Sequence, residues 1–521
     1  PAQEASTTMT SLLHNYSSSD DDNDLKQVAL LQSSDSQHKS SYHDDDDDDD
    51  DHKEDISQHP LSSPSSSRPS QNRPLSDDLV QHYTHTRTWE KNYILPALMT
   101  IVVILIVVFI FIMILGFLGL ALFFQWLHVP KRMVLMIGID GFRHDYFDMY
   151  AKDMPNIMAL NSNGVRAEKM RPIYPTKTFP NHYTLVTGLY AESHGIVSND
   201  FYDPVFEEEF RVGYPSSGEA KFWDEAEPVW LTLERNGLKS ATVFWPGSDV
   251  PIHGKYPTYY SKYEHEMSHE ERIKILFMNF DRPTRERPDF FSMYFSDVDT
   301  AGHNFGPNSL EVRQAIRDVD KSIGSIIDGL EKRSLIDHTD ILIVSDHGMT
   351  AISQDKQIDL RQLINTTTDA LVFNYGPMSD LHLAPGADLD TVFAKVNNKN
   401  PNMVAYKRAD IPERLHYNDN RRIPDILLVA SLGYSIIGEG MEFVGQHGNH
   451  GYDNIDDDMG AIFIGSGPSF LTGGKVVAEF ENVHVYSLIC HLLDAQDIAP
   501  NNGTIFNIQA VLKEEKRKKE E

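Results

Sequence analysis

The pattern of apolar and polar positions divides the chain into stretches of different character. Residues 93–127 form an almost uninterrupted apolar run, whose strongly polar members are Thr100 and Gln125. This run exceeds the ~20 residues that cross a bilayer core of ~30 Å, so it predicts a transmembrane helix. A cleaved signal peptide is the alternative, but its apolar region is shorter and begins near the N-terminus.

From Lys131 onward, short apolar runs alternate with helical patterns. Four runs have the composition of buried parallel strands: residues 134–139, 290–295, 341–344 and 461–464. Between them, apolar residues recur at helical spacing in 155–160 and along one face of 312–330. This alternation predicts an α/β fold, in which helices cover both faces of a mostly parallel sheet.

The two ends of the chain are polar. Residues 1–92 are rich in Ser, Asp, Gln and His and include the unbroken Asp run 44–51, so they predict a disordered acidic tail. Residues 513–521 carry mixed charges and predict a charged C-terminal tail. The folded domain is therefore expected at 131–512. Much of the net charge of −31 lies in the N-terminal tail and says little about a substrate.

Two features bear on the compartment of this domain. The triplets 365–367 and 502–504 have the form of N-glycosylation acceptors, which favours a compartment outside the cytosol. Cys490 is the only cysteine, so no intrachain disulfide supports this placement. It lies in an apolar helical pattern and is expected to pack in the core.

Acidic and histidine side chains follow several of the predicted strands. The candidate metal ligands are Asp140, Asp299, His303, Asp346, His347 and His450. Ligands of parallel α/β sheets bind beyond the carboxyl ends of the strands, and Asp oxygen and His nitrogen are good zinc donors. A single aspartate before a glycine is more often a turn residue. The coincidence of several such sites predicts enough ligands for two metal ions.

The segment 178–182, Thr-Phe-Pro-Asn-His, places a hydroxyl at the beginning of a short predicted helix. A threonine before a proline turn is usually a helix cap. The distant acidic and histidine residues change this interpretation, because they could activate Thr178 as a nucleophile.

These motifs resemble those of the nucleotide pyrophosphatase/phosphodiesterase family, within the alkaline phosphatase superfamily. The resemblance extends from about Met133 to Thr504 and is carried by segments 139–143, 174–182, 194–196, 244–248, 345–349 and 450–451. The apolar run before the domain resembles the type II members, which implies a cytoplasmic N-terminal tail and an extracellular or lumenal catalytic domain. The basic residues that flank the run are balanced and do not decide its orientation.

The resemblance implies roles for individual residues. It assigns one zinc ion to Asp299, His303 and His450, and a second to Asp140, Thr178, Asp346 and His347. Asn199 matches the family's oxyanion-binding asparagine, and Phe179 and Tyr260 match the pair that holds a nucleobase. Zinc itself is inherited from the resemblance, because mixed Asp/His sites also hold other divalent ions.

The implied reaction is hydrolysis of nucleoside triphosphates, dinucleotides or nucleotide sugars through a covalent Thr178 intermediate, releasing a nucleoside 5′-monophosphate. Relatives with similar metal sites prefer lysophospholipids or choline phosphodiesters, and segments 205–223 and 365–434 are expected to decide between these substrates. A phosphomonoesterase, sulfatase or phosphomutase is a rival on the same fold, although a phosphomonoesterase is expected to show an arginine for the extra phosphate charge. A membrane-anchored binding protein is the non-enzyme rival. Specific binding of duplex nucleic acid is not expected.

Overall fold

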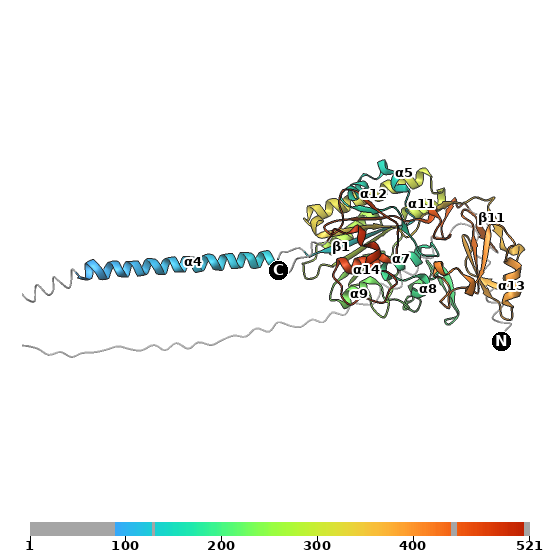
Figure 1. The fold of residues 1–521 in the computed structure, drawn as a ribbon, viewed down its shortest axis with the longest axis horizontal. Helices are drawn as coiled ribbons and strands as arrows, with labels where there is room; N and C mark the ends of the chain where they lie inside the picture. The colour runs from blue at the N-terminus through green and yellow to red at the C-terminus, as the bar shows by residue number, and fades with distance from the viewer. Residues whose placement is uncertain (1–88, 128–130, 439–444, 515–521) are drawn as a thin grey trace, which may run out of the picture. The chain divides into compact units, whose positions relative to one another are not determined.

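The computed structural model describes residues 89–127, 131–438 and 445–514 (Figure 1). Its contacts divide the chain into two compact units, with the boundary between His128 and Val129. The predicted acidic tail lies outside the described residues up to position 88, and so does the charged C-terminal tail from position 515.

The first unit contains the predicted transmembrane helix. It comprises the π-helical turn η1 (Glu90–Ile94) and the helix α4 (Leu95–Leu127), so helical structure begins at Glu90, shortly before the predicted apolar run, and α4 ends where that run ends. The stretch Lys91–Leu120 has a mean hydropathy of 3.6 and is long and apolar enough to cross a membrane. The Thr100 hydroxyl donates to the Pro96 carbonyl at 2.8 Å, which satisfies a polar group inside the apolar helix.

The second unit is built on a large sheet. Within the described residues this sheet has eight strands in the order β19-β2-β18-β9-β1-β8-β6-β7. Their bounds are β1 Met133–Ile139, β2 Val165–Ala167, β6 Ser240–Val243, β7 Tyr259–Ser261, β8 Phe290–Phe295, β9 Thr339–Val344, β18 Phe463–Ser466 and β19 Lys475–Val477. β1 pairs in parallel with both β8 and β9 at the centre, which confirms the predicted parallel core of the sheet.

One predicted strand differs in position and direction. The apolar run 461–464 becomes β18 at Phe463–Ser466, which is antiparallel to its neighbours β9 and β2. A buried strand has the same apolar composition in either direction, so the pattern could not reveal this reversal.

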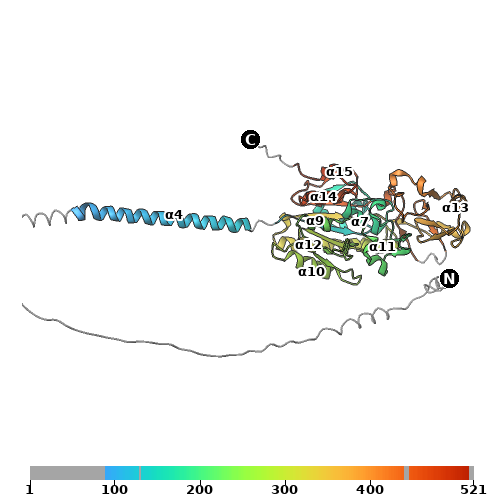
Figure 2. The same ribbon diagram turned by 90° about the horizontal axis from the view of Figure 1, so that it is seen from below.

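Alternate residues of β1 pack into cores on opposite faces of the sheet. Leu135 and Ile137 pack with the helices of one face, and Val134 and Met136 pack with those of the other. The first group of helices is α6 (Pro155–Ser162), α10 (His269–Phe280) and α12 (Leu310–Lys332), and the second is α7 (Thr178–Thr187), α9 (Val229–Arg235) and α14 (His484–Leu492). Figure 1 shows α12 on one side of β1 and α9 and α14 on the other, and Figure 2 shows the same layers from below. Cys490 is buried in α14, as predicted.

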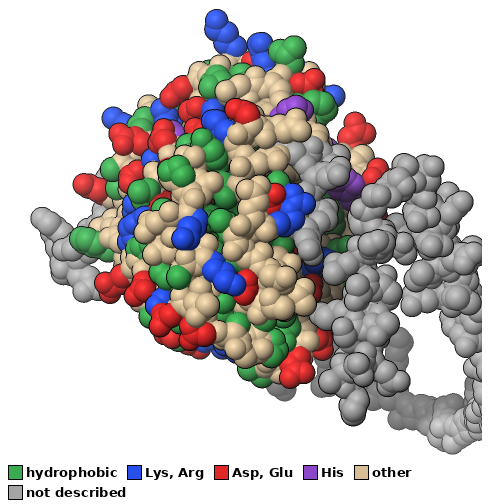
Figure 3. Space-filling model, turned by 90° about the vertical axis from the view of Figure 1, so that its right-hand side faces the viewer, with side chains coloured by type: hydrophobic (Ala, Val, Ile, Leu, Met, Phe, Trp, Pro, Cys, Tyr) green, Lys and Arg blue, Asp and Glu red, His purple; other side chains and the backbone are tan. Residues whose placement is uncertain are grey.

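A smaller antiparallel sheet lies within the segment 365–434. Among the described residues its strands are β12 (Ala370–Val372), β13 (Met378–Leu383), β15 (Ile426–Ala430) and β14 (Met403–Lys407), in that order. The helix α13 (Leu389–Val396) packs with it around a third core. Figure 3 shows the domain from the side where this sheet lies, with acidic and basic side chains interspersed over the visible face.

Arg422 connects this segment to the rest of the domain. Its side chain is fully buried and forms ion pairs with Asp203 at 2.6 Å and with Glu225 at 3.2 Å. It also donates to the carbonyls of Gly195 and Phe222, at 2.6 and 2.8 Å. Gly195 lies four residues before Asn199, so this contact helps to hold the segment that carries a predicted site residue.

Substitution Arg422→Met is expected to lower the free energy of unfolding by about 3–5 kcal/mol, because it breaks a buried ion pair and leaves the Gly195 and Phe222 carbonyls without their arginine donor; Asp203 keeps its contact with the half-buried Arg421. Denaturant titration with tryptophan fluorescence measures this change. Arg333→Met is the matched control: its ion pair with Asp281 is partly exposed, so its loss should cost no more than about 1 kcal/mol. Equal effects of the two substitutions would contradict the anchoring role of Arg422.

Candidate functional site

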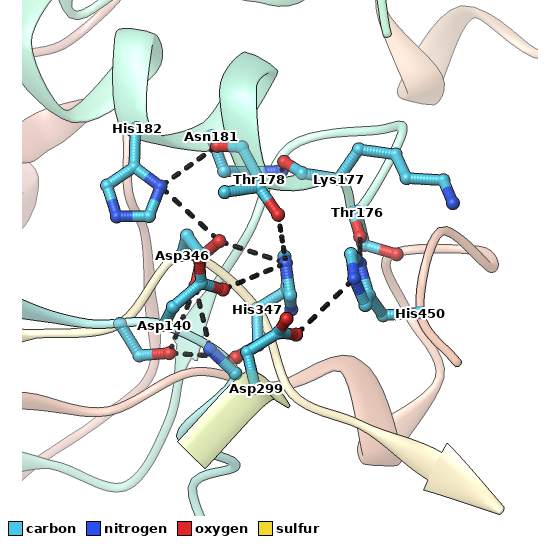
Figure 4. A network of polar contacts seen from close by, with 12 residues as sticks. Asp140, Thr176, Lys177, Thr178, Asn181, His182, Asp299, Asp346, His347 and His450 are labelled. Carbon is cyan, nitrogen blue, oxygen red and sulfur yellow. Dashed lines mark hydrogen bonds and ion pairs between the residues drawn. The ribbon is translucent and has the colours of Figure 1, made fainter. Parts of the chain in front are cut away.

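The predicted ligands meet at the carboxyl edge of the large sheet (Figure 4). Asp140 follows β1, Asp346 follows β9, and Asp299 lies in α11 (Asp297–Phe305), directly after β8. Thr178 is the first residue of α7. Because β1, β8 and β9 run in parallel, their ends bring these residues together from distant parts of the sequence.

One cluster surrounds the Nε2 atom of His347. This atom lies 2.9 Å from Asp346 Oδ2, 3.5 Å from Asp140 Oδ1 and 3.3 Å from the Thr178 hydroxyl. All four side chains are buried. Asp140, Asp346 and His347 together have the geometry of a group that could hold a metal ion.

A second cluster lies beside the first. The Nε2 atoms of His303 and His450 are each 3.5 Å from Asp299 Oδ1, and they are 3.1 Å from one another. The rings of His450 and His347 stack with their centroids 3.5 Å apart, so the two clusters are contiguous. The three residues expected around one ion are therefore brought together.

Backbone contacts fix the tautomer of each histidine. The three Nδ1 atoms contact backbone carbonyls at 2.9 Å: His303 contacts Gly448, His450 contacts Thr176 and His347 contacts Gly348. A carbonyl only accepts hydrogen bonds, so Nδ1 carries the proton and Nε2 of the neutral ring presents a lone pair. Two such lone pairs, 3.1 Å apart in His303 and His450, repel one another unless a cation lies between them.

The carboxylates show the same division between an anchored atom and one aimed at the site. Asp346 Oδ1 accepts from the Gly141 amide, and Asp140 Oδ2 accepts from the Tyr294 hydroxyl. Among the described residues, Asp140 Oδ1, Asp346 Oδ2 and Asp299 Oδ1 are buried without a hydrogen-bond partner. Buried oxygens of this kind are costly unless a cation compensates them, so the residues present fit bound metal.

The pKa values reflect the crowding of like charges. Burial raises the pKa of Asp140 well above its usual value, and the neighbouring carboxylates of Asp346 and Asp299 raise it further. Burial opposes ionisation of Asp346 too, but His347 and His182 outweigh it and hold the pKa of Asp346 well below its usual value. Burial and the adjacent imidazoles lower the pKa of His450 well below its usual value, which keeps its ring neutral.

Asn199 and Phe179 lie together at the beginning of α7. The Phe179 amide donates to Asn199 Oδ1 at 2.9 Å, which orients the side-chain amide and leaves its Nδ2 group as a donor. The Phe179 ring contacts Phe210 and Trp223, with centroids 6.1 and 5.9 Å apart. Both aromatic neighbours come from the segment 205–223, where substrate preference was expected to be decided.

The sequence matches a known protein family over the residues that form this site. The family model described as type I phosphodiesterase/nucleotide pyrophosphatase matches residues 134–453. The chain belongs to this family. It is therefore a hydrolase of the nucleotide pyrophosphatase/phosphodiesterase kind. The matched range contains every residue of both clusters, whereas β18, β19 and α14 lie beyond it.

Individual relatives show the same relationship. Ectonucleotide pyrophosphatase/phosphodiesterase family member 5 from Homo sapiens is 37% identical over 400 residues, which cover 77% of this chain and 82% of the relative. Family member 3 from Bos taurus is 38% identical over 387 residues, which cover 73% of this chain but 44% of that longer protein. A solved structure of the inactive threonine-to-alanine variant of murine family member 5, in complex with AMP, matches 74% of this chain and 100% of its own, with 35% identity and a TM-score of 0.70.

The pairing of Phe179 with Tyr260 around a nucleobase remains a prediction. Tyr260 lies in the edge strand β7 and stacks on Tyr256, with ring centroids 4.5 Å apart. Tyr263, three residues later, contacts the ring of Tyr294 at a centroid distance of 6.5 Å. The Tyr294 hydroxyl donates a hydrogen bond to Asp140. Tyr263 of the tyrosine-rich run therefore also reaches the site, which makes it a second candidate for the role predicted for Tyr260.

Two further residues support the ligands and were not assigned by sequence reasoning. His182 Nδ1 lies 2.9 Å from the Thr178 carbonyl and 3.4 Å from Asp346 Oδ2. Tyr294 donates to Asp140 from inside the apolar run of β8. His182 stands in the same motif as Thr178, which was a usable signal, whereas Tyr294 is indistinguishable in sequence from the other aromatic residues of its strand.

A cavity of about 510 Å³ opens beside the His303 and His450 cluster. It is lined by Lys177, Asn199, Asp200, His303, Ile352, Phe373, Asn374, Tyr375, Gly376, Ser435, Ile436, Ile437, Gln446, Asn449 and His450. Several of these residues come from the segment 365–434, the second region expected to decide substrate preference. Burial lowers the pKa of Lys177 to about 8, against the opposing effect of Asp200 and Asp299.

Substitution Tyr294→Phe is expected to raise the dissociation constant for metal by about 10- to 100-fold, because it removes the hydrogen bond that orients Asp140. Competition with a chromophoric chelator measures this change. Tyr146→Phe is the matched control, since the Tyr146 hydroxyl is buried and, within the described part of the chain, has no hydrogen-bond partner. Unaltered metal affinity in Tyr294→Phe would contradict the role given to this contact.

Proposed function

We propose that the protein hydrolyses nucleotide pyrophosphate and phosphodiester bonds and releases nucleoside 5′-monophosphates, with Thr178 as the nucleophile. The observation that carries this proposal is the position of the Thr178 hydroxyl. It lies 3.3 Å from His347 Nε2, in the cluster that also contains the buried carboxylate oxygens of Asp140 and Asp346 that lack a hydrogen-bond partner among the residues described. The AMP complex of the inactive murine relative, which carries a threonine-to-alanine substitution, supports both the product and the residue type.

The proposal includes two zinc ions. Asp140, Thr178, Asp346 and His347 would hold one, and Asp299, His303 and His450 would hold the other. Bound there, the ions would supply positive charge beside the threonine hydroxyl and the substrate phosphate, which favours alkoxide formation and stabilises the transition state.

The protein groups then act in two displacements. In the first, Thr178 Oγ1 gives its proton to solvent and attacks phosphorus, an Oγ1–P bond forms, and the bond to the leaving oxygen breaks, with its electron pair remaining on that oxygen. The Asn199 Nδ2 group donates to the charge that develops on a non-bridging oxygen. In the second, water attacks the same phosphorus, the Oγ1–P bond breaks, and Thr178 regains a proton.

Phe179 favours a nucleotide as the transferred group. Its ring is held at the beginning of α7 against Phe210 and Trp223, so a base could stack on it without reorganisation of the site. Binding energy from the base, remote from the reacting phosphorus, has value only when the transferred phosphoryl group carries a nucleoside. Tyr260 is the proposed second side of the base platform, and Tyr263 is its alternative because its ring contacts Tyr294.

Replacement of Thr178 by alanine is expected to reduce the rate at least ~10³-fold, because no other hydroxyl replaces the nucleophile. The assay is hydrolysis of 4-nitrophenyl thymidine 5′-monophosphate, with metal content measured on the same sample. Thr187→Ala is the matched control, since the Thr187 hydroxyl lies on the same helix and donates to the Tyr183 carbonyl. It should retain activity within about threefold.

The choice of substrates in that assay tests the activity class. The wild-type protein should cleave the thymidine diester faster than 4-nitrophenyl phosphate, lose activity on chelation and regain it with zinc. Preference for the monoester would indicate a phosphomonoesterase. Preference for 4-nitrophenylphosphorylcholine would indicate a choline-type phosphodiesterase, and full activity of Thr178→Ala would exclude the proposed nucleophile.

We further propose that α4 anchors the protein as a type II membrane protein, with the catalytic domain extracellular or lumenal. Asn365 supports this, because its side chain is exposed at the surface of the domain within an acceptor triplet. In cells, Asn365→Gln is expected to increase electrophoretic mobility by the mass of one N-glycan, and glycosidase treatment should abolish the difference. Unchanged mobility in Asn365→Gln and in Asn502→Gln would contradict this orientation.

A further inference from the structure

The cavity beside His303 and His450 lies where the leaving group must depart. In an in-line displacement the leaving oxygen moves away on the side opposite the nucleophile. Thr178 belongs to the cluster with Asp140 and Asp346, whereas His450 stands at the far side of His347 and also lines the cavity (Figure 4). The half of the substrate that is released therefore has its room in this cavity, and the transferred half lies toward Phe179.

Two side chains of opposite charge line the cavity. Lys177 and Asp200 both line it, and their charges interact. Among the described residues, no carboxylate lies within ion-pair distance of the Lys177 ammonium, so this cation is available to a ligand. Asp200 Oδ1 lies 3.8 Å from Arg211 Nε, and Arg211 does not line the cavity.

The position of Asp200 is fixed by its surroundings. It begins the hairpin strand β4 (Asp200–Asp203), which pairs with β5 (Glu208–Arg211). Its backbone carbonyl accepts from the Asn374 side chain, which also donates to Asp380 at 2.9 Å. The backbone at Asp200 is therefore held in place in the cavity wall that Lys177 also lines.

The rest of the lining is polar without charge, or apolar. Asn374, Gln446 and Asn449 provide amide groups, and Phe373 presents a ring that stacks on Tyr202 with centroids 5.0 Å apart. Such a lining suits the hydroxyl-rich or aromatic body of a sugar or a second nucleoside. A volume of about 510 Å³ leaves space for a body of this kind next to one phosphate.

We propose that Asp200 makes this enzyme selective for leaving groups in which a single phosphate carries a sugar or nucleoside, and disfavours the pyrophosphate leaving group of nucleoside triphosphates. The inference rests on the proposed function and names its substrate class: dinucleotides and nucleotide sugars. Lys177 balances the one charge of a capped distal phosphate. The several charges of two uncapped phosphates exceed what Lys177 balances and are repelled by the Asp200 carboxylate in the same cavity wall.

The test compares kcat/KM for adenylyl compounds that differ only in the leaving group. These are P1,P2-diadenosine diphosphate, ADP-glucose, ATP and the 4-nitrophenyl ester of AMP, assayed with the full-length protein in detergent. The wild-type protein is expected to prefer the dinucleotide over ATP by at least about tenfold. Asp200→Lys should raise kcat/KM for ATP by about tenfold or more and leave the nitrophenyl ester within about twofold, because like-charge repulsion becomes attraction.

Glu209→Gln is the matched control. Glu209 lies on the paired strand of the same hairpin and forms an ion pair with Arg211 at 3.3 Å, but it does not line the cavity. This variant should keep the wild-type ratio of dinucleotide to ATP hydrolysis. Asp200→Asn, which removes the charge without adding bulk, should shift the ratio in the same direction as Asp200→Lys by at least about threefold.

An unchanged ratio in Asp200→Asn and Asp200→Lys, with the nitrophenyl ester still cleaved at the wild-type rate, would overturn the inference and leave the proposed function intact. Faster hydrolysis of ATP than of the dinucleotide by the wild-type protein would overturn it too. Failure of the wild-type protein to cleave any of the four compounds would overturn the proposed function and this inference together.

Discussion

The site depends on one electrostatic constraint: lone pairs and carboxylate oxygens face one another where no proton separates them. His303 and His450 present unprotonated nitrogens 3.1 Å apart, and Asp299 directs a buried oxygen at both. Backbone carbonyls hold the opposite ring nitrogens, so neither ring can relieve the repulsion by changing tautomer. Cations relieve it, and the same positive charge would serve the chemistry at Thr178. The arrangement is therefore costly when empty and suited to catalysis when filled.

Much of this could be predicted from the sequence because the fold puts its chemistry at strand ends. Asp140, Asp299 and Asp346 each follow an apolar run, and the parallel pairing of β1 with β8 and β9 brings them to one edge. The helices α6 and α12 were visible in the spacing of their apolar residues. His450 follows no such apolar run. It was a candidate ligand from its motif, and its assignment to the same ion as Asp299 and His303 depended on the family resemblance.

What escaped prediction depends on contacts between distant segments. The antiparallel direction of β18 and the pairing of the smaller sheet follow from partners that local composition does not name. Tyr294 supports Asp140 from within an apolar strand, where its hydroxyl gave no periodic signal. The choice between the tyrosines of the run 256–263 also depends on such contacts: the Tyr260 ring stacks on Tyr256, while the Tyr263 ring contacts Tyr294. The segments expected to govern substrate preference do border the site, one around Phe179 and the other around the cavity.

The proposed mechanism requires Thr178 to form a covalent bond to the nucleotide. Its most direct test is acid quenching of the full-length protein within milliseconds of mixing with P1,P2-diadenosine diphosphate, followed by mass spectrometry of its tryptic peptides. The peptide that contains Thr178 is expected to carry an adenylyl group. This group should disappear as turnover ends and should never form in Thr178→Ala. Rapid turnover with an unmodified Thr178 peptide at every time point would contradict the account and indicate direct attack by water.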